Sequence, residues 1–425
     1  MTRDLTVRRR LRHVSLFTGY GGLDRAVHQV YGAELLAVSD IDPGANRILA
    51  HNFPDIPNLG DVATIDWTPW RGLVDILTGG FPCQDVSTSG KRAGLLRGVN
   101  RSGLWSQMLR AIDELRPGLV LAENVRGLLS ARTDLDLEPC PECMGAPAGG
   151  QMRALGAVLA DLADIGYDAQ WVLLPASGVG APHRRYRVFL SAHPAAAPRD
   201  PGWVVDGDVE AVDVREVGPL LVTPLANLGS NGGSQHPDKR KAGGHGPTLA
   251  DQVEHLLPTP VVNDMGSGKT IERWDQWTAA MKAKHGNGNG HGPSLSIEAA
   301  RLAAGSGVDR WGKYAAAIHR WETLTRPAPD PTIRRGTGWR LSPKFVEWMM
   351  GQPNGWVTDP AIWAGMTDRY GRPLRADRLA SAAVNAQLKA LGNGVVTQQA
   401  VAAILWLDRA SRQNPSEPAR VVVPA

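Results

Sequence analysis

The chain has 425 residues, of which 43% are hydrophobic and 21% are charged, a balance typical of a soluble globular protein and not of a disordered one. Its net charge of +4 is compatible with DNA binding but also with many metabolic enzymes. Three cysteines are too few for a disulfide framework, and no apolar run approaches the ~18 residues of a membrane span. We therefore expect a cytosolic protein with free thiols that does not enter membranes. We also expect it to be a monomer.

The first part of the chain, from residue 14 to residue 195, alternates short apolar runs with stretches of helical period. Leu23, Ala26, Val27 and Val30, for example, follow the i, i+3, i+4, i+7 spacing of an amphipathic helix. This alternation predicts parallel strands joined by crossover helices in a doubly wound, Rossmann-like α/β sheet, whose ligands bind at the carboxyl ends of the strands. The predicted strands are residues 13–17, 34–40, 74–80, 118–124, 171–176 and 186–192.

The pattern changes after residue 195, where AHPAAAPRDPGW indicates a domain boundary. Residues 196–340 are rich in Gly, Pro, Asn and Trp and show no sustained strand–helix rhythm. They contain an imperfect repeat, in which LLVTP (220–224) precedes GHGPTLADQVE and LLPTP (256–260) precedes GHGPSLSIEAA. We expect residues 196–340 to form a smaller, irregular second domain.

Helical periodicity returns in the last part of the chain, where Ser342 and Pro343 match the N-cap and first residue of a helix. We expect residues 341–374 to connect the two domains and residues 375–412 to complete the domain of residues 1–195. Residues 413–425 are expected to be a tail.

The glycines of SLFTGYGGLDRA lie between a predicted strand and a predicted helix, where missing side chains let a ligand approach the backbone and the helix N-terminus. The third glycine of a dinucleotide fingerprint would fall at Asp24, which argues against a pyrophosphate and against a nicotinamide oxidoreductase. Asp40 ends the next strand, where a carboxylate can accept hydrogen bonds from ribose hydroxyls. The pattern favours a nucleoside-bearing cofactor; a tight turn followed by a solvated acid is the alternative.

Four further side chains have chemistry that suits the same sheet edge. Cys83 follows Pro82 in a polar Gly- and Ser-rich turn, where it is either a small buried hydrophobe or a thiolate nucleophile. Glu123 ends another strand, as either a general acid of raised pKa or a helix cap. Arg185 and Arg187 suit a clamp for a phosphate or a base carbonyl, although ordinary surface arginines would have the same spacing.

Taken in order, the motifs of this chain closely resemble those of the DNA (cytosine-5)-methyltransferases of bacteria and phages. They are SLFTGYGGLD, SDID, GGFPCQDVSTSGKRAGL, RSGLW, ENVRGLL, PHRRYRVF, RLSPKFVEWMMGQP and LGNGVV, and they span residues 14–195 and 340–410. The resemblance implies an enzyme that transfers a methyl group from S-adenosyl-L-methionine to C5 of a cytosine flipped out of a specific duplex DNA sequence. It also allows for a cognate restriction endonuclease as a partner.

The resemblance also implies a role for individual residues. Cys83 matches the nucleophile that forms a covalent adduct at C6 of the cytosine, and Glu123 matches the residue that supports protonation at N3. Arg185 and Arg187 match the pair that holds the base and its phosphates. The cofactor-binding positions are matched by Phe17, Gly19, Gly21, Gly22, Asp40, Ile41, Asp61, Val62, Pro82, Asn393, Gly394 and Val395. The loop expected to close over DNA contains Ser87, Gly90 and Lys91. Two positions depart from the family pattern, with His183 in place of a common Gln and Asp40 in place of a common Glu.

Residues 196–340 match the position of the family's target-recognition domain. Residues 269–340 hold 12 basic and 6 acidic residues, a balance that suits phosphate contacts. The interleaved tryptophans are Trp274, Trp277, Trp311, Trp321 and Trp339. Buried tryptophans among solvated cations would produce the same pattern.

Other interpretations remain beside this one. Cys140 and Cys143 form a single CxxC, which we interpret as an insertion with two thiols, although zinc held with ligands from elsewhere is the alternative; no metal is expected. MGSGKT lacks the first glycine and the preceding strand of a phosphate loop. A catalytically silent DNA-binding protein and an RNA methyltransferase are the rival functions.

Overall fold

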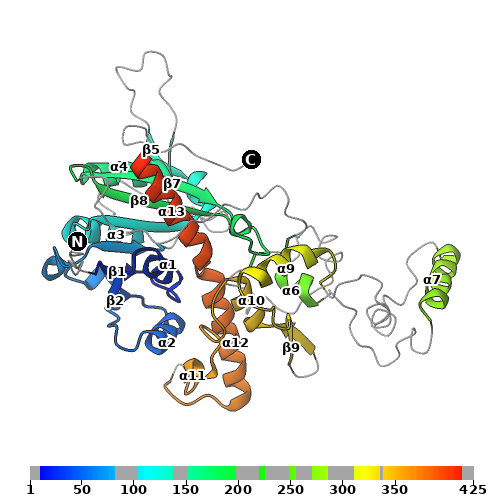
Figure 1. The fold of residues 1–425 in the computed structure, drawn as a ribbon. Coiled ribbons are helices and arrows are strands. Elements are labelled where there is room, and N and C mark those ends of the chain that lie inside the picture. Colours follow the sequence, from blue (N-terminus) through cyan, green and yellow to red (C-terminus); the bar gives the residue numbers. More distant parts are fainter. Residues whose placement is uncertain are drawn as a thin grey trace, which may run out of the picture.

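A six-stranded sheet carries the N-terminal half of the protein in our computed structural model (Figure 1). The structure describes residues 10–81, 103–136, 151–197, 220–221, 223–224, 248–254, 270–285, 311–335, 338–368 and 370–413. The strand order is β2-β1-β3-β4-β8-β7. The strands are β1 (Arg12–Leu16), β2 (Glu34–Ser39), β3 (Ile76–Gly79), β4 (Leu119–Val125), β7 (Tyr167–Leu174) and β8 (Arg187–Pro194). Each of the six predicted strands overlaps one of them.

The direction of one strand differs from the prediction. Strand β1 runs parallel to β2 and β3, and β3 runs parallel to β4, as expected. Strand β8, however, is antiparallel to both β4 and β7, so the prediction of an all-parallel sheet is wrong for this strand. The link from β7 to β8 holds a four-residue 3₁₀ turn, Ala176–Val179, and not the helix that a parallel crossover normally uses. As a result β8 begins at the edge where β4 ends, with Arg187 opposite Val125.

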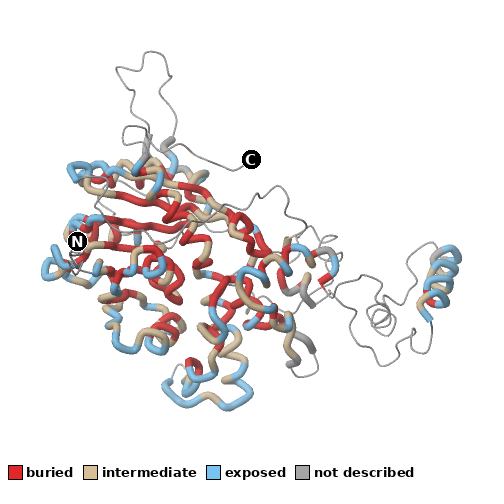
Figure 2. The backbone as a smooth tube through the Cα atoms, in the orientation of Figure 1, coloured by how far each residue is buried: buried red, intermediate tan, exposed pale blue. Residues whose placement is uncertain are grey.

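Helices cover both faces of this sheet, which confirms the doubly wound α/β class. They are α1 (Gly22–Tyr31), α3 (Leu104–Leu115), α4 (Ala154–Asp164) and α13 (Thr397–Gln413). Leu119 and Leu121 of β4 belong to the core beneath α1 and α13. Val120 and Ala122 belong to the opposite core beneath α3 and α4, because successive side chains of a strand point to opposite faces. Figure 2 shows the resulting buried layer along the strands.

A third core lies beside the sheet and is built mainly from residues after 310. Its largest side chains include Trp321, Phe345 and Trp348, and Trp321 Nε1 donates a hydrogen bond to the Trp348 carbonyl at 2.8 Å. Tyr20 and Ile48, from the N-terminal half, belong to the same core, so the two parts pack as one body. The remaining elements are α2 (Pro43–Asn52), β5 (Arg132–Asp136), β6 (Gln151–Arg153), α6 (Leu249–Glu254), α7 (Ile271–His285), α9 (Ala315–Leu324), β9 (Thr332–Arg335), β10 (Gly338–Leu341), α10 (Pro343–Met349), α11 (Pro360–Trp363) and α12 (Ala376–Asn393).

Helix α10 begins where the sequence predicts, with Ser342 before Pro343, although the Ser342 side chain makes no capping hydrogen bond. The helix carries a fully buried carboxylate, Glu347. Its oxygens accept hydrogen bonds from the backbone N–H groups of Gly355, Val357 and Thr358 and from the Thr358 hydroxyl, at 2.7–3.0 Å. Glu347 therefore holds the turn after α10 in place.

Replacing Glu347 with alanine is expected to lower the free energy of unfolding by about 3–5 kcal/mol, because four donors, three of them buried, would lose their acceptor. Urea unfolding followed by circular dichroism measures this loss. Glu114→Ala is the matched control, because Glu114 is a half-exposed partner of Arg110 on α3 and such pairs contribute at most about 1 kcal/mol. Equal losses in the two variants would contradict the role given to Glu347.

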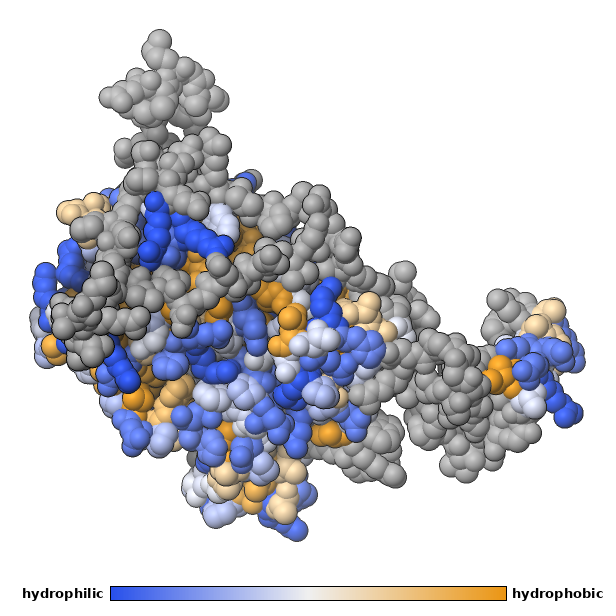
Figure 3. Space-filling view, in the orientation of Figure 1, coloured by the Kyte–Doolittle hydropathy of each residue, from blue (hydrophilic) through white to orange (hydrophobic). Residues whose placement is uncertain are grey.

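By length and composition alone, Ala376–Arg412 could span a membrane, but 67% of its most apolar part is buried inside the protein. Ala400, Ile404 and Leu407 of α13 lie in the core against the sheet. The surface in Figure 3 is mainly hydrophilic, with smaller apolar areas between polar ones. The apolar character of this stretch is therefore explained by packing within the protein.

Candidate active site at the carboxyl edge of the sheet

The glycine turn between β1 and α1 forms one wall of the candidate site. Gly19 and Gly21 have positive φ angles of 61° and 81°, a region that glycine enters without steric cost. The Gly19 N–H donates to Asp40 Oδ2 at 2.8 Å, and a Cβ on Gly19 would meet nothing within 4 Å. A Cβ on Gly22 would lie 2.5 Å from the Val395 carbonyl oxygen. The turn therefore borders open space at Gly19 and packs tightly against the C-terminal segment at Gly22.

Asp40 and Ile41 follow β2 at the same edge. Asp40 also accepts a hydrogen bond from the Asp42 N–H at 2.8 Å, and burial raises the pKa of its carboxyl above the usual value. Ile41 is a large apolar side chain with 68% exposure. A carboxylate beside an exposed apolar surface suits the sugar and the ring of a nucleoside.

Asp61 and Val62 lie at this edge, in the segment that follows α2. The Ser39 hydroxyl donates to the Gly60 carbonyl at 2.7 Å, which ties the segment to the end of β2. Asp61 caps a short 3₁₀ turn by accepting the Ala63 N–H at 2.9 Å, while Val62 is buried beneath it. The fold thus brings these predicted residues next to the end of β2.

The C-terminal segment closes over the glycine turn. The Tyr20 hydroxyl donates to the Val395 carbonyl at 2.5 Å, and a Cβ on Gly394 would lie 1.7 Å from Tyr20 Cε1. Gln352 Nε2 lies 3.4 Å from the Tyr20 hydroxyl, and Asn393 is exposed at the end of α12. Sequence reasoning did not single out Tyr20 or Gln352, because nothing in either motif indicates a contact across more than 300 residues.

Glu123 and Arg187 face each other across β4 and β8. Arg187 Nε lies 2.7 Å from Glu123 Oε1, and Glu123 is 8% exposed. Burial raises the pKa of the Glu123 carboxyl, with the charges of Arg187 and Arg185 opposing that shift. The site therefore holds a buried carboxyl whose proton affinity is increased, as a general acid requires.

The segment that leads to Cys83 begins beside Glu123. A Cβ on Gly80 would lie 3.4 Å from Glu123 Oε2 and 3.9 Å from the Phe17 carbonyl oxygen. Asn124 Nδ2 donates to the Phe81 carbonyl at 3.2 Å, which anchors the chain just before this segment. The predicted residues Pro82, Cys83, Ser87, Gly90 and Lys91 lie outside the described residues.

Arg185 does not share the position of Arg187. It is 2% exposed, and its guanidinium donates to the carbonyl oxygens of Gly392 and Gly394 at 2.9 and 2.6 Å. Its backbone has a φ of 28° and is held by Gln399 Nε2, which donates to the Arg185 carbonyl at 2.8 Å. Burial lowers the pKa of Arg185 to about 9. The two arginines therefore do not form one clamp: Arg187 faces Glu123, and Arg185 is bonded to backbone carbonyl groups.

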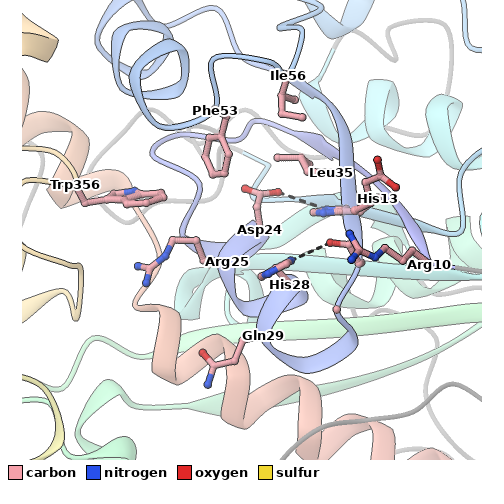
Figure 4. Close-up of a pocket in the computed structure, with 13 residues that line it drawn as sticks. Arg10, His13, Asp24, Arg25, His28, Gln29, Leu35, Phe53, Ile56 and Trp356 are labelled. Atoms are coloured by element: carbon pink, nitrogen blue, oxygen red, sulfur yellow. Dashed lines mark hydrogen bonds and ion pairs between the residues drawn. The ribbon is translucent and has the colours of Figure 1, made fainter.

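A cavity of about 560 Å³ lies along α1, away from the carboxyl edge (Figure 4). Figure 4 shows Asp24 and His13 facing each other, and His13 Nε2 lies 3.4 Å from Asp24 Oδ1. Burial raises the pKa of Asp24 to about 6 and lowers that of His13 to about 3, and His13 Nε2 lies 2.8 Å from the Thr78 hydroxyl. Trp356 lines this cavity and donates to the Tyr20 carbonyl at 2.8 Å. None of the described residues predicted to bind the cofactor lines the cavity, although Trp356 in its wall is bonded to the glycine turn through the Tyr20 carbonyl.

Within the described part of the chain, no group of three or more His, Cys, Asp or Glu side chains is arranged to hold a metal ion. Cys140 and Cys143, the alternative zinc ligands, lie outside the described residues.

Residues 11–201 match the family model of C-5 cytosine-specific DNA methylases. These residues, which make up less than half of the chain, are similar to that family. Type II methyltransferase M.Eco47II of Escherichia coli is 39% identical over 126 residues, which are 29% of this chain and 30% of the relative. Type II methyltransferase M2.BsuMI of Bacillus subtilis (strain 168) is 31% identical over 194 residues, which are 45% of this chain and 44% of the relative. Each alignment spans less than half of the relative's own length.

Two solved structures are also similar at low identity. A Spodoptera frugiperda DNMT2 mutant has 16% identity and a TM-score of 0.43, with 94% of this chain and 99% of that chain covered. The S. pombe Dnmt2 methyltransferase has 14% identity, the same TM-score of 0.43 and the same coverage.

Enzymes of the matched family use S-adenosyl-L-methionine as their methyl donor.

Proposed function

We propose that this protein is a DNA (cytosine-5)-methyltransferase, which methylates C5 of a cytosine flipped out of a specific duplex DNA sequence. The observation that carries the proposal is the buried Glu123–Arg187 pair beside the segment that leads to Cys83, within the part of the chain that matches the family model. We further propose that it acts in the cytoplasm as a monomer, with or without a cognate restriction endonuclease.

The residues at the carboxyl edge suit S-adenosyl-L-methionine, which supplies the methyl group when bound. The open space at Gly19 leaves room for a ligand against the backbone. Asp40 and Asp61 offer carboxylate oxygens for ribose hydroxyls and an adenine amino group, and the exposed Ile41 offers an apolar surface for the ring. Phe17, Gly21, Gly22, Val62, Pro82 and residues 393–395 would complete this site.

In the proposed reaction the chain's own residues prepare and release the base. The Cys83 thiolate forms a bond to C6 of cytosine while Glu123 donates a proton to N3, which makes C5 electron-rich enough to take a methyl group. Arg187 orients the Glu123 carboxyl. Loss of the C5 proton to solvent, return of the N3 proton to Glu123 and cleavage of the bond to sulfur then restore the aromatic ring, the acid and the thiolate.

The variable region, residues 196–340, is proposed to read the DNA sequence. Its basic residues suit phosphate contacts, and Ser87, Gly90 and Lys91 are proposed to close over the DNA. Among the tryptophans noted in the sequence, Trp274, Trp311 and Trp321 are buried, so these three pack within the protein.

Sequencing of 5-methylcytosine in DNA from cells that express the protein tests the proposal. We expect methylation at one short sequence and none above background in cells with an empty vector. Incorporation of labelled methyl groups into purified duplex DNA and into purified tRNA distinguishes DNA methylation from the rival RNA methylation. Methylated tRNA with unmethylated DNA, or no methyl transfer to either, would refute the proposal.

Gly394→Ala is expected to weaken binding of S-adenosyl-L-homocysteine, the demethylated cofactor, because the added methyl would overlap the Tyr20 ring. Overpacking of about 1–3 kcal/mol corresponds to about a 5- to 150-fold loss of affinity. Isothermal titration calorimetry measures it. Gly103→Ala, where a Cβ meets nothing within 4 Å, should leave the affinity unchanged, and an unchanged affinity in Gly394→Ala would remove segment 393–395 from the cofactor site.

A further inference from the structure

Arg185 bridges two parts of the molecule that are far apart in the sequence. At one end its guanidinium donates to the Gly392 and Gly394 carbonyls at 2.9 and 2.6 Å. At the other end Nη1 donates to the Pro224 carbonyl at 3.1 Å, and the Arg185 N–H donates to the Thr223 hydroxyl at 3.1 Å. One buried residue thus joins the end of α12 to the first part of the variable region.

The end at α12 matches the charge and shape of arginine. Helix α12 has 18 residues, and its last carbonyl groups carry the partial negative charge of a helix C-terminus. A planar guanidinium donates in several directions at once, which a lysine ammonium on a flexible stem does not reproduce. The bridge therefore depends on arginine and not merely on a positive charge.

The end at the variable region is docked by more than Arg185. The Leu221 N–H donates to the Pro182 carbonyl at 2.9 Å, and Leu221 is 3% exposed. His183 is fully buried, and its Nε2 lies 3.1 Å from the Met349 carbonyl oxygen. Leu221, Thr223 and Pro224 of the first LLVTP copy are consequently bonded to Pro182 and Arg185.

The segment at the end of α12 is in direct contact with the glycine turn. Gly394 is packed against the Tyr20 ring, the Tyr20 hydroxyl donates to the Val395 carbonyl, and that carbonyl oxygen is 2.5 Å from where a Cβ on Gly22 would lie. Because this contact leaves no free space, a shift of the segment held by Arg185 must move the turn.

We propose that Arg185 is a positioning residue that couples DNA binding by the variable region to cofactor binding at the glycine turn. A shift of the segment on one side of the bridge is transmitted through the Arg185 hydrogen bonds to the segment on the other side, so each ligand stabilises the arrangement that the other ligand binds. The two ligands therefore strengthen each other's binding, and they do so through Arg185. The inference rests on the proposed methyltransferase function.

The test compares the affinity for S-adenosyl-L-homocysteine with and without a short duplex that carries the sequence mapped by 5-methylcytosine sequencing. In the wild type we expect the duplex to raise this affinity by about 5- to 150-fold, the usual range of coupling between sites. In Arg185→Lys the increase should fall below about twofold. A purely structural arginine would lower both affinities and leave their ratio unchanged, which would overturn the proposal.

Thr223→Val provides a second test that leaves the guanidinium and its carbonyl partners in place. Its affinity for S-adenosyl-L-homocysteine alone should equal that of the wild type, while the increase caused by the duplex should be smaller. Thr323→Val is the control, because the exposed Thr323 hydroxyl donates only to the Arg320 carbonyl. A full duplex effect in Thr223→Val, or none in an active wild type, would overturn the coupling alone. A wild type that methylates no DNA would instead refute the proposed function.

Discussion

Replacing Cys83 with serine is expected to abolish the covalent trapping of this protein on duplex DNA that carries 5-fluorocytosine at its target. In the proposed reaction the thiolate adds to C6, and the fluorine left at C5 after methyl transfer cannot depart as a proton does. The wild type should therefore form an adduct that resists denaturation, and only with S-adenosyl-L-methionine present. A serine hydroxyl is scarcely ionised at neutral pH and does not replace the thiolate.

The other two cysteines provide the controls for this experiment. Cys140→Ser and Cys143→Ser should still be trapped, because both residues lie outside the motifs that resemble the family. Denaturing gel electrophoresis detects the adduct, and peptide mapping locates the modified residue. An adduct in Cys83→Ser, or DNA attached to Cys140 or Cys143, would show that the nucleophile is assigned to the wrong residue.

Glu123→Gln is expected to lower turnover by about 10²- to 10⁴-fold, the usual contribution of general acid catalysis. An amide can still donate a hydrogen bond to N3, but it has no acidic proton to transfer. The amide oxygen also accepts a weaker hydrogen bond from Arg187 Nε than the carboxylate does, so this side chain is oriented less firmly. Binding of S-adenosyl-L-homocysteine should remain within about twofold of the wild type, because Glu123 lies outside the proposed cofactor contacts.

Single-turnover methylation of duplex DNA measures the change. Glu114→Gln introduces the same chemical change on the outer side of α3, where Glu114 pairs with Arg110, and it should keep normal turnover. Near-normal turnover in Glu123→Gln would exclude Glu123 as the acid. Equal losses of turnover and of cofactor affinity would instead indicate a general structural defect.

Several features of the fold follow from local patterns in the sequence. The six strands are predicted from short apolar runs typical of buried strands, and helix α1 is predicted from the 3.6-residue period of its apolar side chains. The glycine turn was predicted for a similar reason, since Gly19 and Gly21 adopt backbone angles that favour glycine. These features depend on neighbours in the chain, and a local pattern is enough to reveal them.

The partners of Arg185 and Arg187 did not follow from the sequence. The spacing of PHRRYRVF predicted a common clamp, yet Arg187 faces Glu123 and Arg185 bonds to Gly392 and Gly394. The division arises because β8 runs antiparallel, which places its first residue at the edge where β4 ends. A parallel β8 would have carried Arg187 to the opposite edge, away from Glu123.

The sequence by itself thus determined the α/β class and the order of the motifs, because each depends on periodicity or on residue type. It also placed the glycine turn, Asp40 and Glu123 at the carboxyl edge, because each follows or ends a predicted strand. Only the tertiary structure decided the direction of β8, the closure of Tyr20 over Val395 and the bridge made by Arg185. The contacts of Arg185 with Gly392 and Gly394 span 207 and 209 residues. Such contacts are selected by the packing of whole elements against each other, and no local spacing encodes them.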